Sequence, residues 1–114
     1  MSSPGRLAST PSPPYWAVIF TNVRTPTDDE AYAQTADEMV RLASEQPGFL
    51  GIESVRDAEG VGITVSYWAS EEAIVSWRSQ ADHRTAQRLG RERWYQAYEL
   101  RVARVERAYA FTGR

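Results

Sequence analysis

The sequence predicts a small α+β domain in which two helices cover one face of an antiparallel sheet. Apolar residues recur first with the period of a strand and then with that of a helix, in the order β-α-β-β-α-β. The first predicted strand is apolar on both faces, so both faces are expected to be covered. A length of 114 residues suits one domain, and 42% hydrophobic with 25% charged residues is an ordinary globular composition.

The predicted domain spans residues 15–111, and residues 112–114 form its C-terminal end. Residues 1–14 contain four prolines and four serines, a composition typical of a flexible tail. Residues 15–24, YWAVIFTNVR, are mostly β-branched or aromatic and predict a strand. One face of this strand consists of Trp16, Val18, Phe20 and Asn22, and the other of Tyr15, Ala17, Ile19 and Thr21.

The segment 25–48 predicts an amphipathic helix. Thr27 and Glu30 have the spacing of a capping box at its start, and Pro47-Gly48 ends it. Its apolar residues recur at helical spacing, as one face of a helix does. This stripe consists of Tyr32, Ala36, Met39, Val40 and Ala43.

A β-hairpin follows over residues 49–68. Polar and apolar residues alternate on both sides of DAEG, residues 57–60, which supplies the turn. Gly60 is expected to take a positive φ there, because glycine has no Cβ to clash. The hairpin therefore contributes the second and third strands.

A second helix is expected to begin after Ser70, a residue suited to the N-cap, and to turn Trp77 inward together with Ala73 and Ile74. Asp82 is expected to cap a further helical piece that ends at Gly90. The last strand is predicted over residues 94–111. Leu100 and Val102 stand at even positions, whereas Val105, Tyr109 and Phe111 stand at odd positions, which predicts a bulge near Ala103 or Arg104.

This order of elements is that of the ferredoxin-like fold, an antiparallel sheet with both helices on one face. The other face of the sheet keeps apolar side chains that the chain has no further element to cover. A second copy of the chain is the simplest cover, so the sequence predicts a homodimer packed sheet against sheet.

Composition and charge argue against several classes of protein. The chain has no cysteine, which excludes disulfides and thiolate catalysis. It has neither a long apolar run nor a secretory signal, so a cytoplasmic protein that does not enter a membrane is expected. Residues 83–114 carry 8 arginines and 3 acids, and these acids are interleaved with the arginines. Surface pairing is therefore favoured over nucleic-acid binding.

Residues 48–83, GFLGIESVRDAEGVGITVSYWASEEAIVSWRSQADH, resemble the antibiotic biosynthesis monooxygenase domain. One motif is the Pro-Gly-Phe turn at residues 47–49. The other is W-x-S-x-E-A-x-x-x-W, which consists here of Trp68, Ser70, Glu72, Ala73 and Trp77. The resemblance covers about residues 15–111 and implies a dimeric α+β barrel with a pocket between sheet and helices.

Members of this family have several activities, and the resemblance leaves more than one open. It first implies a cofactor-independent monooxygenase that acts on a planar aromatic or quinone-like metabolite. The alternatives are a protein that binds or degrades haem, and a non-catalytic dimer that binds a small ligand. Asn22 and Trp77 match pocket residues of the haem-degrading members, but Gln87 occupies the place of their haem-ligating histidine.

Three residues are candidates for catalysis: Asn22, Trp77 and His83. The Asn22 amide lies on an apolar face and needs partners, either in a nearby loop or on a substrate oxygen. Trp77 either fills the core or forms a pocket wall that stacks on a flat substrate. His83 is either an exposed residue or a general base. A single histidine without nearby acids gives too few ligands for a metal.

The expected substrate-binding residues are Phe20, Tyr67, Trp68 and Arg84. Trp68 stands at a strand end and equally suits a packing role between strand and helix. Arg84 shares a helical face with Arg88, so the two either receive an anionic substrate or form a solvated face. Further tyrosines, Tyr95, Tyr98 and Tyr109, are expected to add to an aromatic interior, where their hydroxyls are available to line a pocket.

Overall fold

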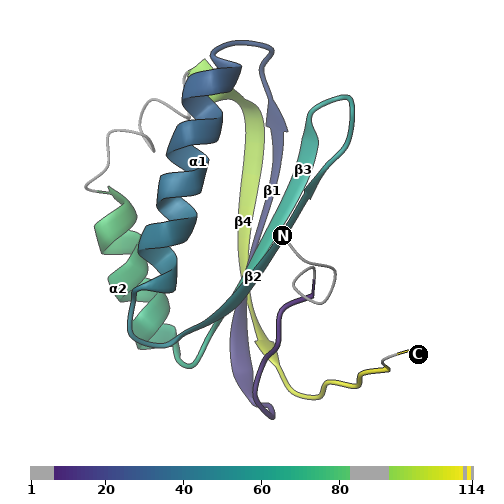
Figure 1. Ribbon diagram of the computed structural model, residues 1–114. Coiled ribbons are helices and arrows are strands. Elements are labelled where there is room, and N and C mark those ends of the chain that lie inside the picture. Colours follow the sequence, from purple (N-terminus) through teal and green to yellow (C-terminus); the bar gives the residue numbers. More distant parts are fainter. Residues whose placement is uncertain (1–6, 83–92, 112, 114) are drawn as a thin grey trace.

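The computed structural model describes residues 7–82, 93–111 and 113 and has the predicted order of elements. These are β1 (Tyr15–Arg24), α1 (Asp29–Ser44), β2 (Phe49–Arg56), β3 (Val61–Trp68), α2 (Glu71–Asp82) and β4 (Tyr95–Val105). The four strands form one antiparallel sheet in the order β2-β3-β1-β4. Both helices lie on the same face of it (Figure 1). The predicted ferredoxin-like α+β fold is therefore confirmed.

The hairpin turn and the start of α2 form as predicted. The Asp57 carboxylate accepts hydrogen bonds from two backbone N–H groups of the turn, both at 2.9 Å, and Gly60 has φ +94°. At α2 the Ser70 hydroxyl oxygen accepts a hydrogen bond of 3.1 Å from the backbone N–H of Ala73. Both features depend on bonds between residues no more than four apart, which is why the local sequence predicts them.

The start of α1 differs from the prediction, which placed a capping box at Thr27. The N-cap is Asp28, which has a left-handed backbone (φ 56°) and no side-chain cap hydrogen bond. The Thr27 hydroxyl instead donates to the Arg93 carbonyl oxygen at 2.9 Å, and the Asp28 carboxylate pairs with the Arg93 guanidinium at 2.6 Å. Both side chains tie the entry of α1 to the start of β4, so neither caps the helix.

The bulge in β4 lies at its beginning, so the prediction of a bulge at residues 103–104 is wrong. The pairing of β4 with β1 skips Gln96, which lies between the paired residues Tyr95 and Ala97. Because side chains alternate along a strand, the extra residue turns Tyr95 to the same face as Tyr98. This is the face that the helices cover.

β4 is also shorter than the predicted strand, because it ends at Val105. Tyr109 and Phe111 follow outside the sheet and are almost fully exposed. Val105, the last residue of β4, pairs with Tyr15 and lies on the opposite face from Val102, with no register shift between them. The strand thus carries apolar residues on both faces, and no second bulge is needed.

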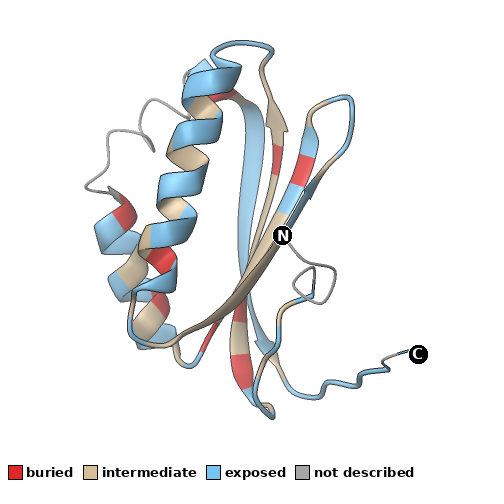
Figure 2. Cartoon of the chain, viewed as in Figure 1, coloured by how far each residue is buried: buried red, intermediate tan, exposed pale blue. Residues whose placement is uncertain are grey.

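The core is small and lies where the C-terminal end of α1 meets α2 and the sheet. Ala43, Trp68 and Ile74 are buried there, and partly buried apolar side chains pack against them. Trp68 is 0% exposed; its ring meets Phe49 edge to face at 5.4 Å and stacks on Trp77 at 6.2 Å. In Figure 2 the buried positions are scattered along the elements and do not form a continuous layer.

The face of the sheet opposite the helices is partly covered by residues 7–14. The backbone N–H of Ala8 donates to the Glu53 carboxylate at 2.8 Å, and the Thr10 hydroxyl donates to the Tyr15 hydroxyl at 3.0 Å. The second half of the segment predicted as a flexible tail therefore contacts the sheet. The first six residues of that segment lie outside the described part of the chain.

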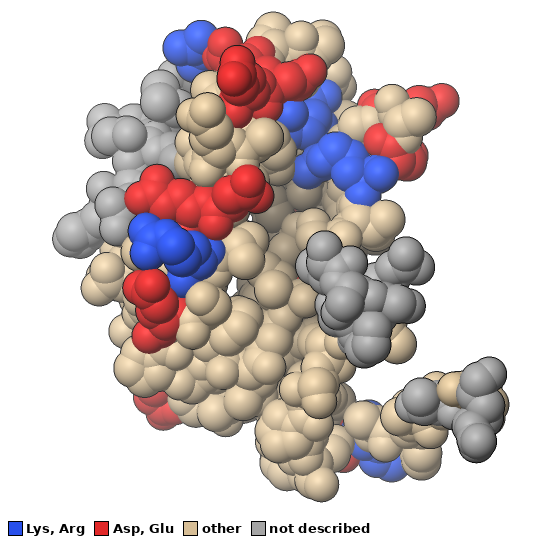
Figure 3. Space-filling view, viewed as in Figure 1, with Lys and Arg blue, Asp and Glu red and all other residues tan. Residues whose placement is uncertain are grey.

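Charged side chains of both signs interleave on the face that Figure 3 shows. On α1, Arg41 pairs with Glu45 at 3.1 Å. On β4 and just after it, Arg101 pairs with Glu99 at 3.2 Å and Arg104 with Glu106 at 2.7 Å. The surface pairing expected for the C-terminal arginines is confirmed for these two pairs. Within the described ranges, the helices are too short and too polar to cross a membrane.

Candidate functional site

A cavity of about 300 Å³ lies between α1 and the sheet. All six elements contribute side chains to its walls, together with Trp94 just before β4. Among the described residues that line it, none is charged. A volume of this size is at the lower end of the range for small-molecule sites, which are typically apolar with a few polar groups.

The apolar stripe predicted on α1 forms one wall of this cavity. All five of its members line it: Tyr32, Ala36, Met39, Val40 and Ala43. Small side chains at positions 36 and 43 leave space between helix and sheet that larger ones would fill. The prediction of an apolar stripe is confirmed, and the stripe faces a cavity as well as a core.

One end of the cavity is aromatic. The rings of Phe20, Tyr95 and Tyr98 meet edge to face at centroid distances of 5.4 to 5.8 Å. The Tyr32 ring meets those of Trp94 and Tyr95 in the same way, at 5.6 and 5.7 Å. Edge-to-face contacts orient each ring firmly, so this wall has a defined shape.

The strands β2 and β3 contribute a row of hydroxyls to the cavity. The hydroxyls of Ser54 and Thr64 share a hydrogen bond of 2.7 Å, and the Ser66 hydroxyl accepts one of 2.9 Å from the indole N–H of Trp68. Because the partners of these groups come from the protein itself, this side of the cavity is polar but largely satisfied.

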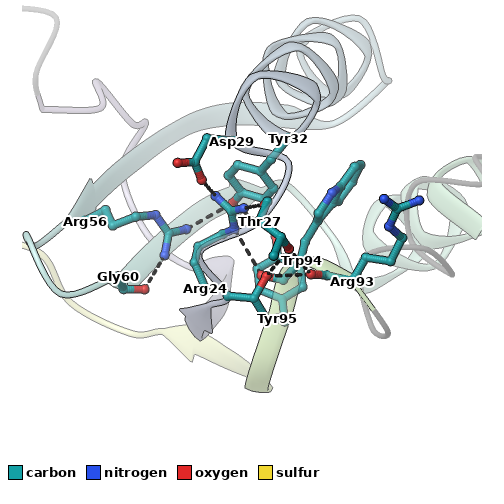
Figure 4. A network of polar contacts seen from close by, with 10 residues as sticks. Arg24, Thr27, Asp29, Tyr32, Arg56, Gly60, Arg93, Trp94 and Tyr95 are labelled. Atoms are coloured by element: carbon teal, nitrogen blue, oxygen red, sulfur yellow. Dashed lines mark hydrogen bonds and ion pairs between the residues drawn. The ribbon is translucent and has the colours of Figure 1, made fainter.

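A network of polar contacts at the aromatic end includes the Tyr32 hydroxyl (Figure 4). Its oxygen accepts hydrogen bonds from the Arg56 guanidinium at 3.0 Å and from the Tyr95 hydroxyl at 3.1 Å. The guanidinium carbon of Arg24 lies 3.9 Å from the centroid of the Tyr32 ring. One phenol thus contacts two cations that do not line the cavity themselves.

The two arginines are held in place by backbone carbonyls. Arg24 donates to the carbonyl oxygens of Trp94 at 3.0 Å and Thr27 at 2.7 Å, and Arg56 donates to that of Gly60 at 2.7 Å. Arg24 also pairs with an exposed carboxylate, that of Asp29, at 3.3 Å. Among the described residues, Arg56 forms no ion pair.

Burial raises the pKa of the Tyr95 phenol well above its usual range, and the hydrogen bond to Tyr32 raises it further. Tyr95 is therefore a neutral donor at physiological pH. Burial also raises the pKa of Tyr67 to about 12, with the hydrogen bond to Glu53 as the second cause. That residue lies on the other face of the sheet.

Two buried polar atoms near this end have no partner among the described residues. One is the indole N–H of Trp94, whose residue is 6% exposed. The other is the amide oxygen of Asn22, whose residue is 1% exposed and whose amide N–H makes one long bond of 3.5 Å to the Phe20 carbonyl. Unpaired buried polar atoms are uncommon and call for a water, a ligand or another explanation.

The structure brings only some of the expected site residues together. Phe20 and Trp77 line the cavity. Asn22 lies on the same face of β1, where it pairs with the cavity-lining Tyr98, but it does not itself reach the cavity. Trp68 lies in the core and is absent from the cavity wall.

Tyr67 points to the opposite face of the sheet. Its hydroxyl donates to the Glu53 carboxylate at 2.8 Å, and its ring meets Tyr15 at 5.9 Å. His83 and Arg84 lie outside the described residues, as does Gln87.

The sequence did not single out Tyr32, Arg24 or Arg56. A phenol within the apolar stripe of a helix is the one signal that could have drawn attention to Tyr32. The arginines stand at the ends of two predicted strands, where a charged residue is common. Their convergence on Tyr32 depends on how distant segments pair. Among the described residues, no three His, Cys, Asp or Glu side chains cluster as a metal site would require.

Fold and cavity together define a class of small α+β proteins with ferredoxin-like topology and an apolar cavity between sheet and helices. The chain belongs to the antibiotic biosynthesis monooxygenase family, whose model matches residues 15–89. It is 53% identical to the uncharacterized protein YqjZ of Bacillus subtilis over 105 residues. This alignment covers 92% of this chain and 91% of that protein.

A second relative is the jasmonate monooxygenase ABM of Pyricularia oryzae, 32% identical over 94 residues. The match covers 79% of this chain but only 43% of that protein. Among solved structures, Rv0793 from Mycobacterium tuberculosis has a TM-score of 0.70 at 18% identity, and the superposition covers 83% of this chain and 99% of the Rv0793 chain. SnoaB, a cofactor-independent oxygenase from Streptomyces nogalater, has a TM-score of 0.66 at 14% identity. That superposition covers 88% of this chain and 93% of the SnoaB chain. These two structures support the fold.

Proposed function

We propose that this protein is a cofactor-independent monooxygenase that oxidises a planar aromatic or quinone-like metabolite. The observation that carries the proposal is the cavity of about 300 Å³, apolar along most of its wall and bordered by tyrosines at one end. Membership of the antibiotic biosynthesis monooxygenase family supports the reaction class. The oxygenase named among the structural neighbours supports a reaction without cofactor.

The substrate is proposed to lie flat against Trp77, with its oxygen atoms toward the tyrosines. Trp77 lines the cavity and is fixed from behind by its stack on the buried Trp68, so its ring is a rigid wall. Phe20 and the small residues of α1 shape the rest of the space. This arrangement is suited to orient a flat ring system.

The proposed reaction converts a ring methylene to a carbonyl. Loss of one methylene proton produces an enolate, which passes one electron to molecular oxygen. The resulting radical and superoxide combine to a carbon-bound peroxide after protonation, and loss of water leaves the carbonyl, so that R₂CH₂ + O₂ gives R₂C=O + H₂O. The contribution of the protein is to bind the ring and to stabilise the negative charge on the enolate oxygen.

Asn22 and His83 keep proposed roles in this reaction. The unpartnered amide oxygen of Asn22 is suited to hold a water that in turn donates to the substrate oxygen. His83, the single histidine of the chain, is proposed as the base that removes the first proton.

A homodimer is proposed as the functional unit. Three apolar side chains on the face of the sheet opposite the helices stay exposed in the single chain: Val55 at 70%, Val61 at 40% and Ile63 at 42%. Residues 7–14 cover another part of that face and leave these three uncovered. A second copy would remove them from water.

Oxygen consumption with a panel of hydroxyanthrones tests the proposed function. The protein, freed of metals by a chelator, is expected to consume oxygen and form the matching quinone in air, with no reaction under argon. Trp77→Ala is expected to lower kcat/KM about tenfold, as the loss of one aromatic stacking contact implies. Val75→Ala, a truncation at an exposed position of the same helix, serves as the matched control. The absence of oxygen uptake with every hydroxyanthrone would refute the proposal.

A further inference from the structure

We infer that the aromatic end of the cavity is a binding site for an ionised oxygen of the ligand, a phenolate or enolate, formed by the Tyr32 hydroxyl with Arg24 and Arg56 behind it. This inference rests on the proposed function for the class of ligand and deepens it, because it names the chemical state in which the ligand is bound.

The first step concerns the hydrogen of the Tyr32 hydroxyl. Its oxygen already accepts two hydrogen bonds, from Arg56 at 3.0 Å and from Tyr95 at 3.1 Å. A phenol has one hydrogen to donate, and no described residue accepts it. Since Tyr32 lines the cavity, a ligand oxygen there can accept this hydrogen.

The second step concerns charge. The side chain of Arg24 is 8% exposed, and its counter-ion Asp29 lies in solvent at 81% exposure. Arg56 is partly buried and its guanidinium contacts a carbonyl and a phenol, with no carboxylate among its described partners. Positive charge at this end is therefore incompletely balanced, and a buried cation is normally paired with an anion.

The third step concerns how the charge reaches the ligand. Arg56 donates to the oxygen of the hydroxyl whose hydrogen is inferred to bind the ligand, so it polarises that O–H bond. Arg24 lies over the Tyr32 ring at 3.9 Å, and the buried N–H of Trp94 adds an uncompensated dipole nearby. The cavity itself is apolar, which strengthens each of these effects on an anion within it.

The bulge at Gln96 belongs to this site. Without the extra residue Tyr95 would point to the opposite face of the sheet, and Tyr32 would lose one of its two donors. The high pKa of Tyr95 keeps it protonated and therefore able to donate at every physiological pH.

Binding of alizarin, a planar dihydroxyanthraquinone that changes colour when it ionises, tests this inference. The full-length protein is titrated with alizarin at a series of pH values, and the pKa of the bound dye is read from its absorbance. The pKa of the bound dye is expected to fall by about 1 relative to free dye, as an opposite charge within reach implies.

Three variants separate the parts of the site. Tyr32→Phe keeps the ring and removes the hydroxyl donor. The pKa of the dye bound to this variant is therefore expected to be close to that of the free dye. Arg56→Gln removes a charge and is expected to weaken binding of the ionised dye about tenfold. Arg56→Lys, which keeps the charge but not the fork geometry, is expected to lie between Arg56→Gln and wild type.

Two controls keep the test decisive. The dimethyl ether of alizarin cannot ionise and is expected to bind wild type and Tyr32→Phe equally, which shows that the cavity is intact. Tyr15→Phe removes a hydrogen-bonded phenol on the opposite face of the sheet and is expected to leave the pKa of the bound dye unchanged.

An unchanged pKa of the bound dye, an equal lowering in Tyr32→Phe, or failure of alizarin to bind at all would overturn the inference. Oxygen uptake is measured separately. A lowered pKa without oxygen uptake would leave the anion site standing and remove the monooxygenase. Oxygen uptake without a lowered pKa of the bound dye would leave the monooxygenase standing and remove the anion site.

Discussion

Tyr32 connects an apolar cavity to charges that lie outside it. A guanidinium inside the cavity would need its own hydration or counter-ion and would cost more than it contributes. Placing Arg24 and Arg56 behind a phenol keeps them bonded to backbone carbonyls while their field still acts on the cavity. A neutral side chain thus presents the effect of a charge to a ligand.

Asn22 is a second residue whose chemistry is poorly matched to its surroundings. It is 1% exposed, and its amide oxygen has no partner among the described residues. A buried polar atom without a partner lowers stability, so a group of this kind is more easily explained by function than by folding.

This leads to a prediction about stability and activity at one residue. Asn22→Leu, a replacement with the same number and branching of side-chain heavy atoms but no polar ones, is expected to leave the free energy of unfolding unchanged or to raise it by about 1 kcal/mol. Urea denaturation followed by tryptophan fluorescence measures this. Oxygen uptake with hydroxyanthrones is expected to fall in the same variant. A loss of stability together with full activity would show that the amide serves the fold instead.

At the scale of elements, the two helix starts show which caps a sequence can reveal. Ser70 caps α2 through a bond to Ala73, three residues away. Thr27 has an equally good local pattern at α1, but its hydroxyl bonds Arg93, which is 66 residues away. A distant partner that competes for the same hydroxyl is invisible to a local pattern.

The cap at α2 gives a prediction for that element. Ser70→Ala is expected to lower the free energy of unfolding by about 1 kcal/mol, because the N–H of Ala73 loses its acceptor. Ser70→Asp should restore most of the lost free energy of unfolding, because an aspartate side chain can also accept this hydrogen bond. Ser44→Ala, at the exposed C-terminal end of α1, is the matched control and is expected to have little effect. Equal stabilities of Ser70→Ala and wild type in urea denaturation would mean that this bond is replaced by water.

The two faces of the sheet differ at the scale of the whole molecule. The face under the helices encloses the cavity, and the other is covered by residues 7–14 in one part only. Gly51 lies in that part, where a Cβ would come within 2.9 Å of the Ala8 Cβ. The N-terminal segment therefore approaches the sheet closely, and the uncovered remainder is available for a second copy.

A homodimer is the prediction at this scale. Sedimentation is expected to show two chains per particle for the wild type. Ile63→Glu, which buries a charge in the proposed interface, is expected to shift the particle to a single chain. Val75→Glu places the same charge at an exposed position of α2 and should leave the dimer intact. A folded wild type that sediments as one chain at high concentration would contradict this prediction.

The amino-acid sequence by itself determined the order of elements, the hairpin turn at Gly60, the cap at Ser70 and the apolar stripe of α1. These depend on periodicity and on bonds between neighbours, which any short stretch contains. Only the tertiary structure decided that Gln96 is a bulge, that residues 7–14 lie on the sheet, and that Arg24, Arg56 and Tyr95 meet at Tyr32. Tyr32 and Tyr95 are 63 residues apart, and their contact follows from strand register and helix placement, which no local pattern of residues specifies.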